Sequence, residues 1–71
     1  MASLALTIER QREIDDRWLA EVVELPGVLA YGSSESEATT RVHALALRVV
    51  ADRLEHGEIR RGPLTISFTA S

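Results

Sequence analysis

A hydrophobic residue recurs at every second position near the start of the chain. Leucine or isoleucine occupies alternate positions of the segment 4–8, which is typical of a half-buried β-strand. After a polar stretch, the pair Asp15-Asp16 predicts a turn, because Asp tolerates turn and left-handed backbone conformations better than most residues. The segment 17–23 then alternates again and predicts a second strand. The close spacing of the two strands predicts an antiparallel hairpin.

The second strand is partly apolar on both faces, so its period does not tell which face is buried. One face carries Trp18, Ala20 and Val22, and the other carries Leu19, Glu21 and Val23. Pro26-Gly27 then predicts a tight corner, because proline lacks the ladder donor and glycine accepts positive φ. The segment 28–31 predicts a short third strand, which Gly32 closes. Gly62-Pro63 precedes a fourth alternating strand over 64–69.

The segment 34–56 predicts one long helix. Ser34 is a good N-cap, and Glu37 stands three residues later, as in a capping box. No helix breaker follows until Gly57, which is a natural C-cap. At 1.5 Å per residue the helix is roughly 33 Å long. The fold class is therefore α+β with the order β-β-β-α-β: a three-to-four-stranded antiparallel sheet covered by one long helix.

The helix carries two apolar rows. The row predicted to cover the sheet consists of Ala38, Val42, Leu45 and Val49, with Ala46 at its edge. The second row has the three-four-three spacing of a heptad seam and consists of Ala44, Leu47, Ala51 and Leu54. One sheet face needs only one row, so the second row is predicted to be an oligomer or partner interface. Two alternatives stay open: one broad arc on a curved sheet, or a partly exposed row without function.

Length, charge and cysteine content narrow the class of protein. The 71 residues form one domain, 1–71, and contain no cysteine, so self-association is the remaining way to support so small a core. A dimer or tetramer is expected. The net charge of -3 disfavours nucleic-acid binding and would attract a basic protein. No signal peptide and no apolar run long enough for a membrane span is visible, and a cytoplasmic location is expected.

Motifs that carry chemistry are missing from the chain. Its glycines do not have the spacing of a phosphate-binding loop. His43 and His56 stand nearly four helical turns apart and cannot share a metal. Trp18 and Tyr31 are predicted to pack rather than to stack on bases. The carboxylates that would have to hold magnesium in a nuclease are Glu9, Glu13, Asp15, Asp16, Glu21 and Glu24, and solvated charge is the expected explanation for them. No enzyme activity, cofactor or metal is predicted.

Two stretches resemble the HicB-like antitoxin domains of prokaryotic toxin-antitoxin systems. One runs from Asp16 through Trp18, Ala20-Glu21-Val22 and Leu25-Pro26-Gly27 to Val28, and the other runs from Tyr31-Gly32 through Ser34 to Glu37-Ala38. The resemblance covers about residues 4–56. It implies a partial ribonuclease-H-like fold without catalytic carboxylates.

The resemblance also implies a function. Such domains neutralise a small basic HicA-type toxin that cleaves messenger RNA, by direct binding. The family's additional DNA-binding segment has no counterpart after the helix here, so no DNA binding is expected. Where relatives often have glycine in the first hairpin, this chain has Asp16. The alternatives are a stand-alone oligomeric or regulatory module without a toxin and, less favoured, a weak metal-dependent nuclease.

Overall fold

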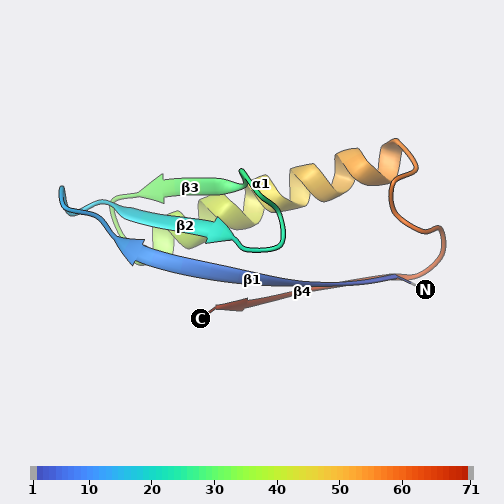
Figure 1. Cartoon of the computed structure of the whole chain (residues 1–71), viewed down its shortest axis with the longest axis horizontal. Helices are drawn as coiled ribbons and strands as arrows, with labels where there is room; N and C mark the ends of the chain where they lie inside the picture. Colours follow the sequence, from blue (N-terminus) through green and yellow to red (C-terminus); the bar gives the residue numbers. More distant parts are fainter. Residues whose placement is uncertain (1, 71) are drawn as a thin grey trace.

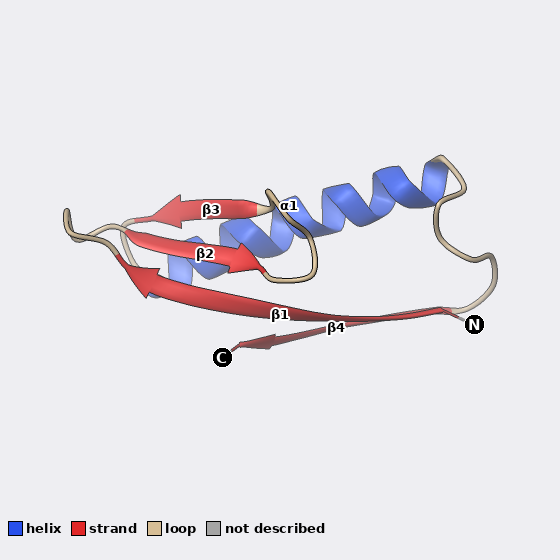
Figure 2. Ribbon diagram, viewed as in Figure 1, coloured by secondary structure: helices blue, strands red, loops and turns tan. Residues whose placement is uncertain are grey.

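One sheet and one helix make up the computed structural model, which describes residues 2–70 (Figures 1 and 2). The elements follow in the order β1 (Ala2–Arg12), β2 (Trp18–Val22), β3 (Leu29–Gly32), α1 (Glu35–Glu55) and β4 (Leu64–Ala70). The predicted α+β class and the β-β-β-α-β order are therefore confirmed. No helix within residues 2–70 is long and apolar enough to cross a membrane.

The sheet is mixed, with the strand order β3-β2-β1-β4. The first three strands are antiparallel, as predicted, but β4 runs parallel to β1 and pairs Leu4 with Ile66 and Leu6 with Phe68. The expectation of a wholly antiparallel sheet was wrong for this strand. Because α1 carries the chain back along the sheet, β4 must run in the direction of β3, which is also the direction of β1 (Figure 1).

The inner face of the sheet, toward α1, holds a thin apolar core. The face of β2 that carries Ala20 and Val22 is buried, and Trp18 packs against it half-buried, which settles the orientation that the period had left open. Leu6 and Leu25 are buried at 4% and 5% exposure, and among residues 2–70 the largest side chains below 2% exposure are the β-branched Ile8 and Val42. Burial of apolar area is the main stabilising term in folding, so this core supplies little of it.

The first turn confirms the role predicted for its aspartates. Asp16 has φ 65°, in the left-handed region that Asp enters more readily than most residues. Its backbone N–H donates to the Glu13 carbonyl over 3.1 Å, and its carboxylate pairs with Arg12 at 2.8 Å. A residue other than glycine is thereby accommodated without loss of the hairpin.

The N-cap of α1 is Ser34, as the sequence predicts, whereas the C-cap is one residue before the predicted Gly57. The Glu37 backbone N–H donates to Ser34 Oγ over 3.0 Å, and the Glu37 carboxylate in turn accepts from the Ser33 N–H. This is a variant of the capping box: the Glu37 carboxylate accepts from the residue before the cap, Ser33, whereas in the usual motif it accepts from the N–H of the cap residue itself. At the other end His56 is the C-cap and Gly57 follows with φ 72°, the left-handed conformation that glycine supplies.

The helix covers only part of the sheet. Its buried positions are Ala38, Val42, Ala46 and Val50, so the covering row is centred one residue further on than predicted, with Leu45 and Val49 half-buried at its side. The helix packs on β3 and β2 and touches β1 little. Its C-terminal half extends past the ends of β2 and β3 (Figure 1), and the chain is elongated, 43 × 20 × 16 Å.

Candidate protein-binding surfaces

The second apolar row of α1 is exposed along its whole length. Leu47 and Leu54 are 46% and 43% exposed, and Ala44 and Ala51 are exposed as well. All four lie on the same helix. The structure therefore leaves the predicted interface residues available to a partner.

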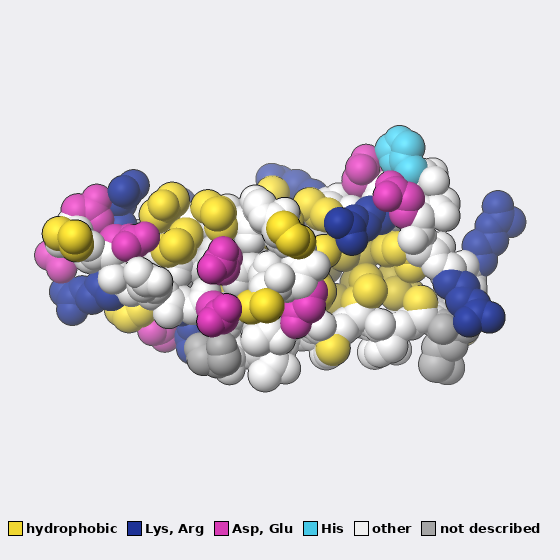
Figure 3. Space-filling model, in the orientation of Figure 1, with side chains coloured by type: hydrophobic (Ala, Val, Ile, Leu, Met, Phe, Trp, Pro, Cys, Tyr) yellow, Lys and Arg dark blue, Asp and Glu magenta, His cyan; other side chains and the backbone are white. Residues whose placement is uncertain are grey.

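A notch in the sheet lies beside the C-terminal half of α1, which extends past the ends of β2 and β3 (Figure 1). β2 pairs with β1 only over Ile8–Arg12, and one further bond joins the Val23 N–H to the Thr7 carbonyl at 3.0 Å. Among residues 2–70 no strand lies on this side of residues 2–6 of β1, whereas β4 pairs with them on the other side. Figure 3 shows hydrophobic side chains at the surface between this part of β1 and the helix. We call this open edge, together with the half of α1 that extends past β2 and carries Leu47 and Leu54 (Figure 1), the notch.

The outer face of the sheet, away from α1, combines carboxylates with exposed apolar groups. Glu9 and Glu21 are directly opposite each other on β1 and β2, and Leu29 of β3 is the next partner in the same cross-strand row. Leu29 and Tyr31 are each 39% exposed. Figure 3 shows acidic and hydrophobic side chains intermingled over β1, β2 and β3.

Two contacts fix the border of this outer face. The Thr7 backbone N–H donates to Glu24 Oε1 over 2.7 Å and its hydroxyl donates to Oε2 over 2.8 Å. The backbone bond is the main reason why the pKa of Glu24 lies below its usual value. On the opposite border the Arg17 guanidinium lies over the Tyr31 ring, 4.6 Å from its centre. Glu24 is therefore ionised at neutral pH and held in place.

The other residues considered for chemistry do not converge. His43 packs on Phe68 with ring centroids 4.4 Å apart, whereas His56 is exposed and bonds Asp52 at the far end of α1. Glu13, Asp15 and Asp16 surround the first turn, away from the carboxylates of the outer face. Within residues 2–70 there is no group of three or more His, Cys, Asp or Glu side chains placed to hold a metal ion.

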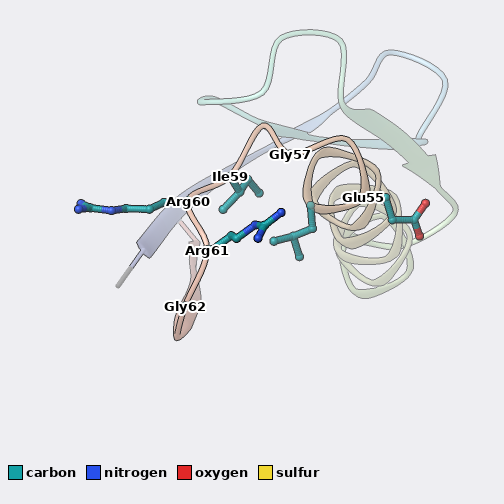
Figure 4. Close-up of a pocket in the computed structure, with 7 residues that line it drawn as sticks. Glu55, Gly57, Ile59, Arg60, Arg61 and Gly62 are labelled. Carbon is teal, nitrogen blue, oxygen red and sulfur yellow. The ribbon is translucent and has the colours of Figure 1, made fainter.

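A hollow of about 460 Å³ lies between the end of α1 and the loop to β4. Its lining includes Leu54, Glu55, Ile59, Arg60 and Arg61. Figure 4 shows that Arg60 extends away from the helix and that Arg61 points toward it. The two side chains do not aim at a common point, and the hollow lacks the convergent polar groups of a small-molecule site.

The sequence predicted the exposed helix row but missed both the notch and the composition of the outer face. The notch depends on the unequal lengths of β1 and β2, because β1 begins at Ala2 whereas β2 ends at Val22, opposite Ile8. The outer face depends on the register that sets Glu9 opposite Glu21. The feature of the sequence that indicates this outer face is the alternation of Glu21 with apolar residues along β2.

Comparison with known proteins adds no relative to this description. No protein-family model, no curated protein and no solved structure matches the chain.

Proposed function

We propose that the chain is a protein-binding domain of the antitoxin type, which neutralises a small basic messenger-RNA-cleaving toxin of the HicA type by direct contact. The partner surface in this proposal is the outer face of the sheet. The observation that carries it is the pair formed by Glu9 and Glu21, two exposed carboxylates in direct cross-strand register.

Like charges directly opposite each other destabilise a sheet. Within residues 2–70 neither Glu9 nor Glu21 has a cationic partner, although four other carboxylates pair with arginine. Lysine or arginine side chains of a bound protein would relieve this repulsion and gain charge-assisted hydrogen bonds. The repulsion is therefore a cost in the free chain that a basic partner converts into affinity and specificity.

The apolar neighbours of the two carboxylates fit the same role. Protein interfaces place aromatic and aliphatic groups at their centre and polar groups at the rim. Here Leu29 and Tyr31 are exposed beside Glu21, with Val23 at 49% exposure near the end of β2. A basic protein could thus cover the apolar groups while its charges meet the carboxylates. The family resemblance in residues 4–56 supports the identity of that partner, because the β-β-β-α-β order is the one it implies.

The alternative is a stand-alone oligomeric module without a toxin, favoured by the exposed row on α1. Copurification distinguishes the two hypotheses. The tagged chain is expected to retain a small basic protein from the source cell, and the RNA cleavage by this protein is expected to stop when the chain is added back in equimolar amount. Recovery of the chain's own copies alone would overturn the toxin-binding proposal and leave the oligomeric module.

Charge reversal then locates the surface. Glu21→Lys is expected to weaken binding of the basic protein at least tenfold, measured by calorimetry. Glu58→Lys makes the same change of net charge at an exposed loop residue outside the sheet and is expected to change the affinity less than threefold. Equal losses for the two variants would mean that only net charge matters and would contradict the assignment of this face.

A further inference from the structure

We infer that the notch is the site where a second copy of the chain adds its own β1, so that two chains form one continuous sheet about a two-fold axis. The occupant follows from strand direction, from the overhang of α1 and from the surface that one chain leaves exposed. The inference concerns a different surface from the proposed toxin contact and does not depend on it.

The open edge of β1 presents unpaired backbone groups to the notch. Thr7 turns its backbone toward the β2 side, where its carbonyl accepts from Val23 and its N–H donates to Glu24. Because backbone groups alternate between the two sides of a strand, Ser3 and Ala5 turn theirs to the same side. A strand added there would pair with these two residues and stop at Thr7, which is already bonded.

A second β1 fits this edge because the pairing is self-complementary. Laid antiparallel, the partner's β1 pairs Ser3 of each chain with Ala5 of the other, and Leu4 lies opposite Leu4 on the two-fold axis. A two-fold axis perpendicular to the sheet keeps both inner faces on the same side. The partner's β1 then lies in line with β2, and its β4 lies in line with β3, since β4 flanks β1 on the side away from the notch.

The overhang of α1 matches this arrangement. At 1.5 Å per residue, the 21 residues of α1 span about 31 Å. The five residues of β2 span only about 17 Å at roughly 3.4 Å per residue. The remainder of the helix projects over the place that the partner's strands would fill. In the dimer, Leu47 and Leu54 would contact apolar residues of the other copy, such as Leu4 and Ile66, which are half-buried in the single chain.

The single chain is less compact and exposes more surface than a typical monomer of its size. Its radius of gyration is 13.1 Å, against about 11 Å for a compact domain of this length. Its accessible surface is 4895 Å², against about 4,400 Å² for a compact monomer of this mass. The excess is a large part of the roughly 800 Å² that each partner contributes to a standard interface.

Charge does not oppose the contact. Residues 2–6 of β1 are uncharged, as are the β4 residues Leu64–Ala70 beside them. The opposite edge of the sheet is less suited to strand addition, because β3 has only four residues and the Arg41 guanidinium donates to the Tyr31 carbonyl over 2.9 Å. The outer edge of β4 is the competing site, since it is seven uncharged residues long.

Disulfide trapping discriminates between the two edges, because the chain has no cysteine of its own. Leu4→Cys places one thiol of each copy on the proposed axis, in a pair without backbone hydrogen bonds, where the side chains approach most closely. Under mild oxidation we expect a covalent dimer of nearly all of this variant. Ser67→Cys, at the centre of β4, is the matched control and is expected to remain monomeric on the same gel.

Solution mass supplies an independent measurement. Light scattering at about 50 μM should give twice the 7.8 kDa of one chain, and Leu54→Glu should shift the population toward monomer with its helical circular dichroism retained. Leu54 is exposed in the single chain, so this variant is not expected to unfold. A strictly monomeric wild type, or a covalent dimer from Ser67→Cys and none from Leu4→Cys, would overturn the inference.

Discussion

A Cβ atom placed on Gly32 would lie 2.5 Å from the backbone nitrogen of Ala38. Gly32 ends β3 and Ala38 lies in the first turns of α1, so this contact sets how closely the helix lies on the sheet. The close approach is the physical reason for glycine at this position, because every other side chain would push the backbone of the helix outward. The residue is part of the resemblance to HicB-like domains, but its role is packing.

Gly32→Ala is therefore expected to destabilise the fold by about 1–3 kcal/mol, the usual cost of overpacking a filled site. Urea unfolding followed by circular dichroism measures it. Gly27→Ala is the control: nothing lies within 4 Å of its Cβ, and φ 87° predicts only the smaller cost of about 1 kcal/mol for a left-handed alanine. An equal loss in both variants would mean that the contact with Ala38 is not limiting.

Stability should fall in acid because the folded chain stabilises the ionised form of two carboxyls, those of Glu24 and Glu37. Backbone N–H groups of Thr7 and Ser33 lower the pKa of Glu24 and of Glu37 below the ordinary value of 4.5, and for Glu37 the charge of Arg41 adds to the effect. A carboxyl whose pKa is lower in the folded than in the unfolded state stabilises the fold at pH values above the unfolded pKa. This contribution is lost as the pH falls through the folded pKa. The midpoint of urea unfolding is thus expected to decrease below about pH 4.5.

Glu24→Gln tests the cause of that decrease. Without an ionisable group at this position, the slope of the midpoint with pH between 4.5 and 3 should flatten. Glu58→Gln, at an exposed loop residue with no such bond from its side chain, should leave the slope of the wild type. An unchanged slope in Glu24→Gln would show that the bonds to Thr7 do not shift this titration.

Glu21→Lys should separate stability from binding. Replacing the like-charged pair with Glu9 by an opposite-charged one is expected to raise the free energy of unfolding by roughly 0.2–1 kcal/mol. The same change is expected to weaken binding of the basic partner at least tenfold. A variant that becomes more stable while losing its partner marks Glu21 as a residue kept for binding; a loss of stability would contradict the repulsion between Glu9 and Glu21.

Asp16 tests the first hairpin. Asp16→Gly should leave stability within about 0.5 kcal/mol, because glycine relieves the left-handed φ of 65° while the exposed ion pair with Arg12 is worth little. Asp16→Ala, which keeps the strain and loses the pair, should cost about 1 kcal/mol. Thermal melting of both variants measures the difference, and a stable alanine variant would show that the turn relaxes to another conformation.

The sequence predicted what local physics controls. Ser34 is the N-cap of α1 and Gly57 follows its C-cap, because capping is decided by residues three or four apart. The hairpin between β1 and β2 follows from alternation and the acidic turn. Glu37 and Arg41, four residues apart on α1, form an ion pair at 3.3 Å, and Asp52 lies beside His56, also four residues on.

The features that the sequence did not predict all depend on tertiary placement. The direction of β4 follows from the end of the sheet to which α1 returns the chain. The burial of Val50, which belongs to neither of the two predicted rows, depends on how α1 packs against β2 and β3. The opposition of Glu9 and Glu21 depends on the hairpin register, which no single strand encodes. The candidate binding surfaces arise from these placements.

The most direct test of the proposed function is a titration of the copurified basic protein's RNA cleavage with the purified chain. The account predicts that cleavage falls linearly and ends at one chain per toxin molecule, and that Glu21→Lys needs at least tenfold more chain to reach the same inhibition, whereas Glu58→Lys behaves as the wild type. Cleavage that continues undiminished at a tenfold excess of the wild-type chain would contradict the antitoxin function.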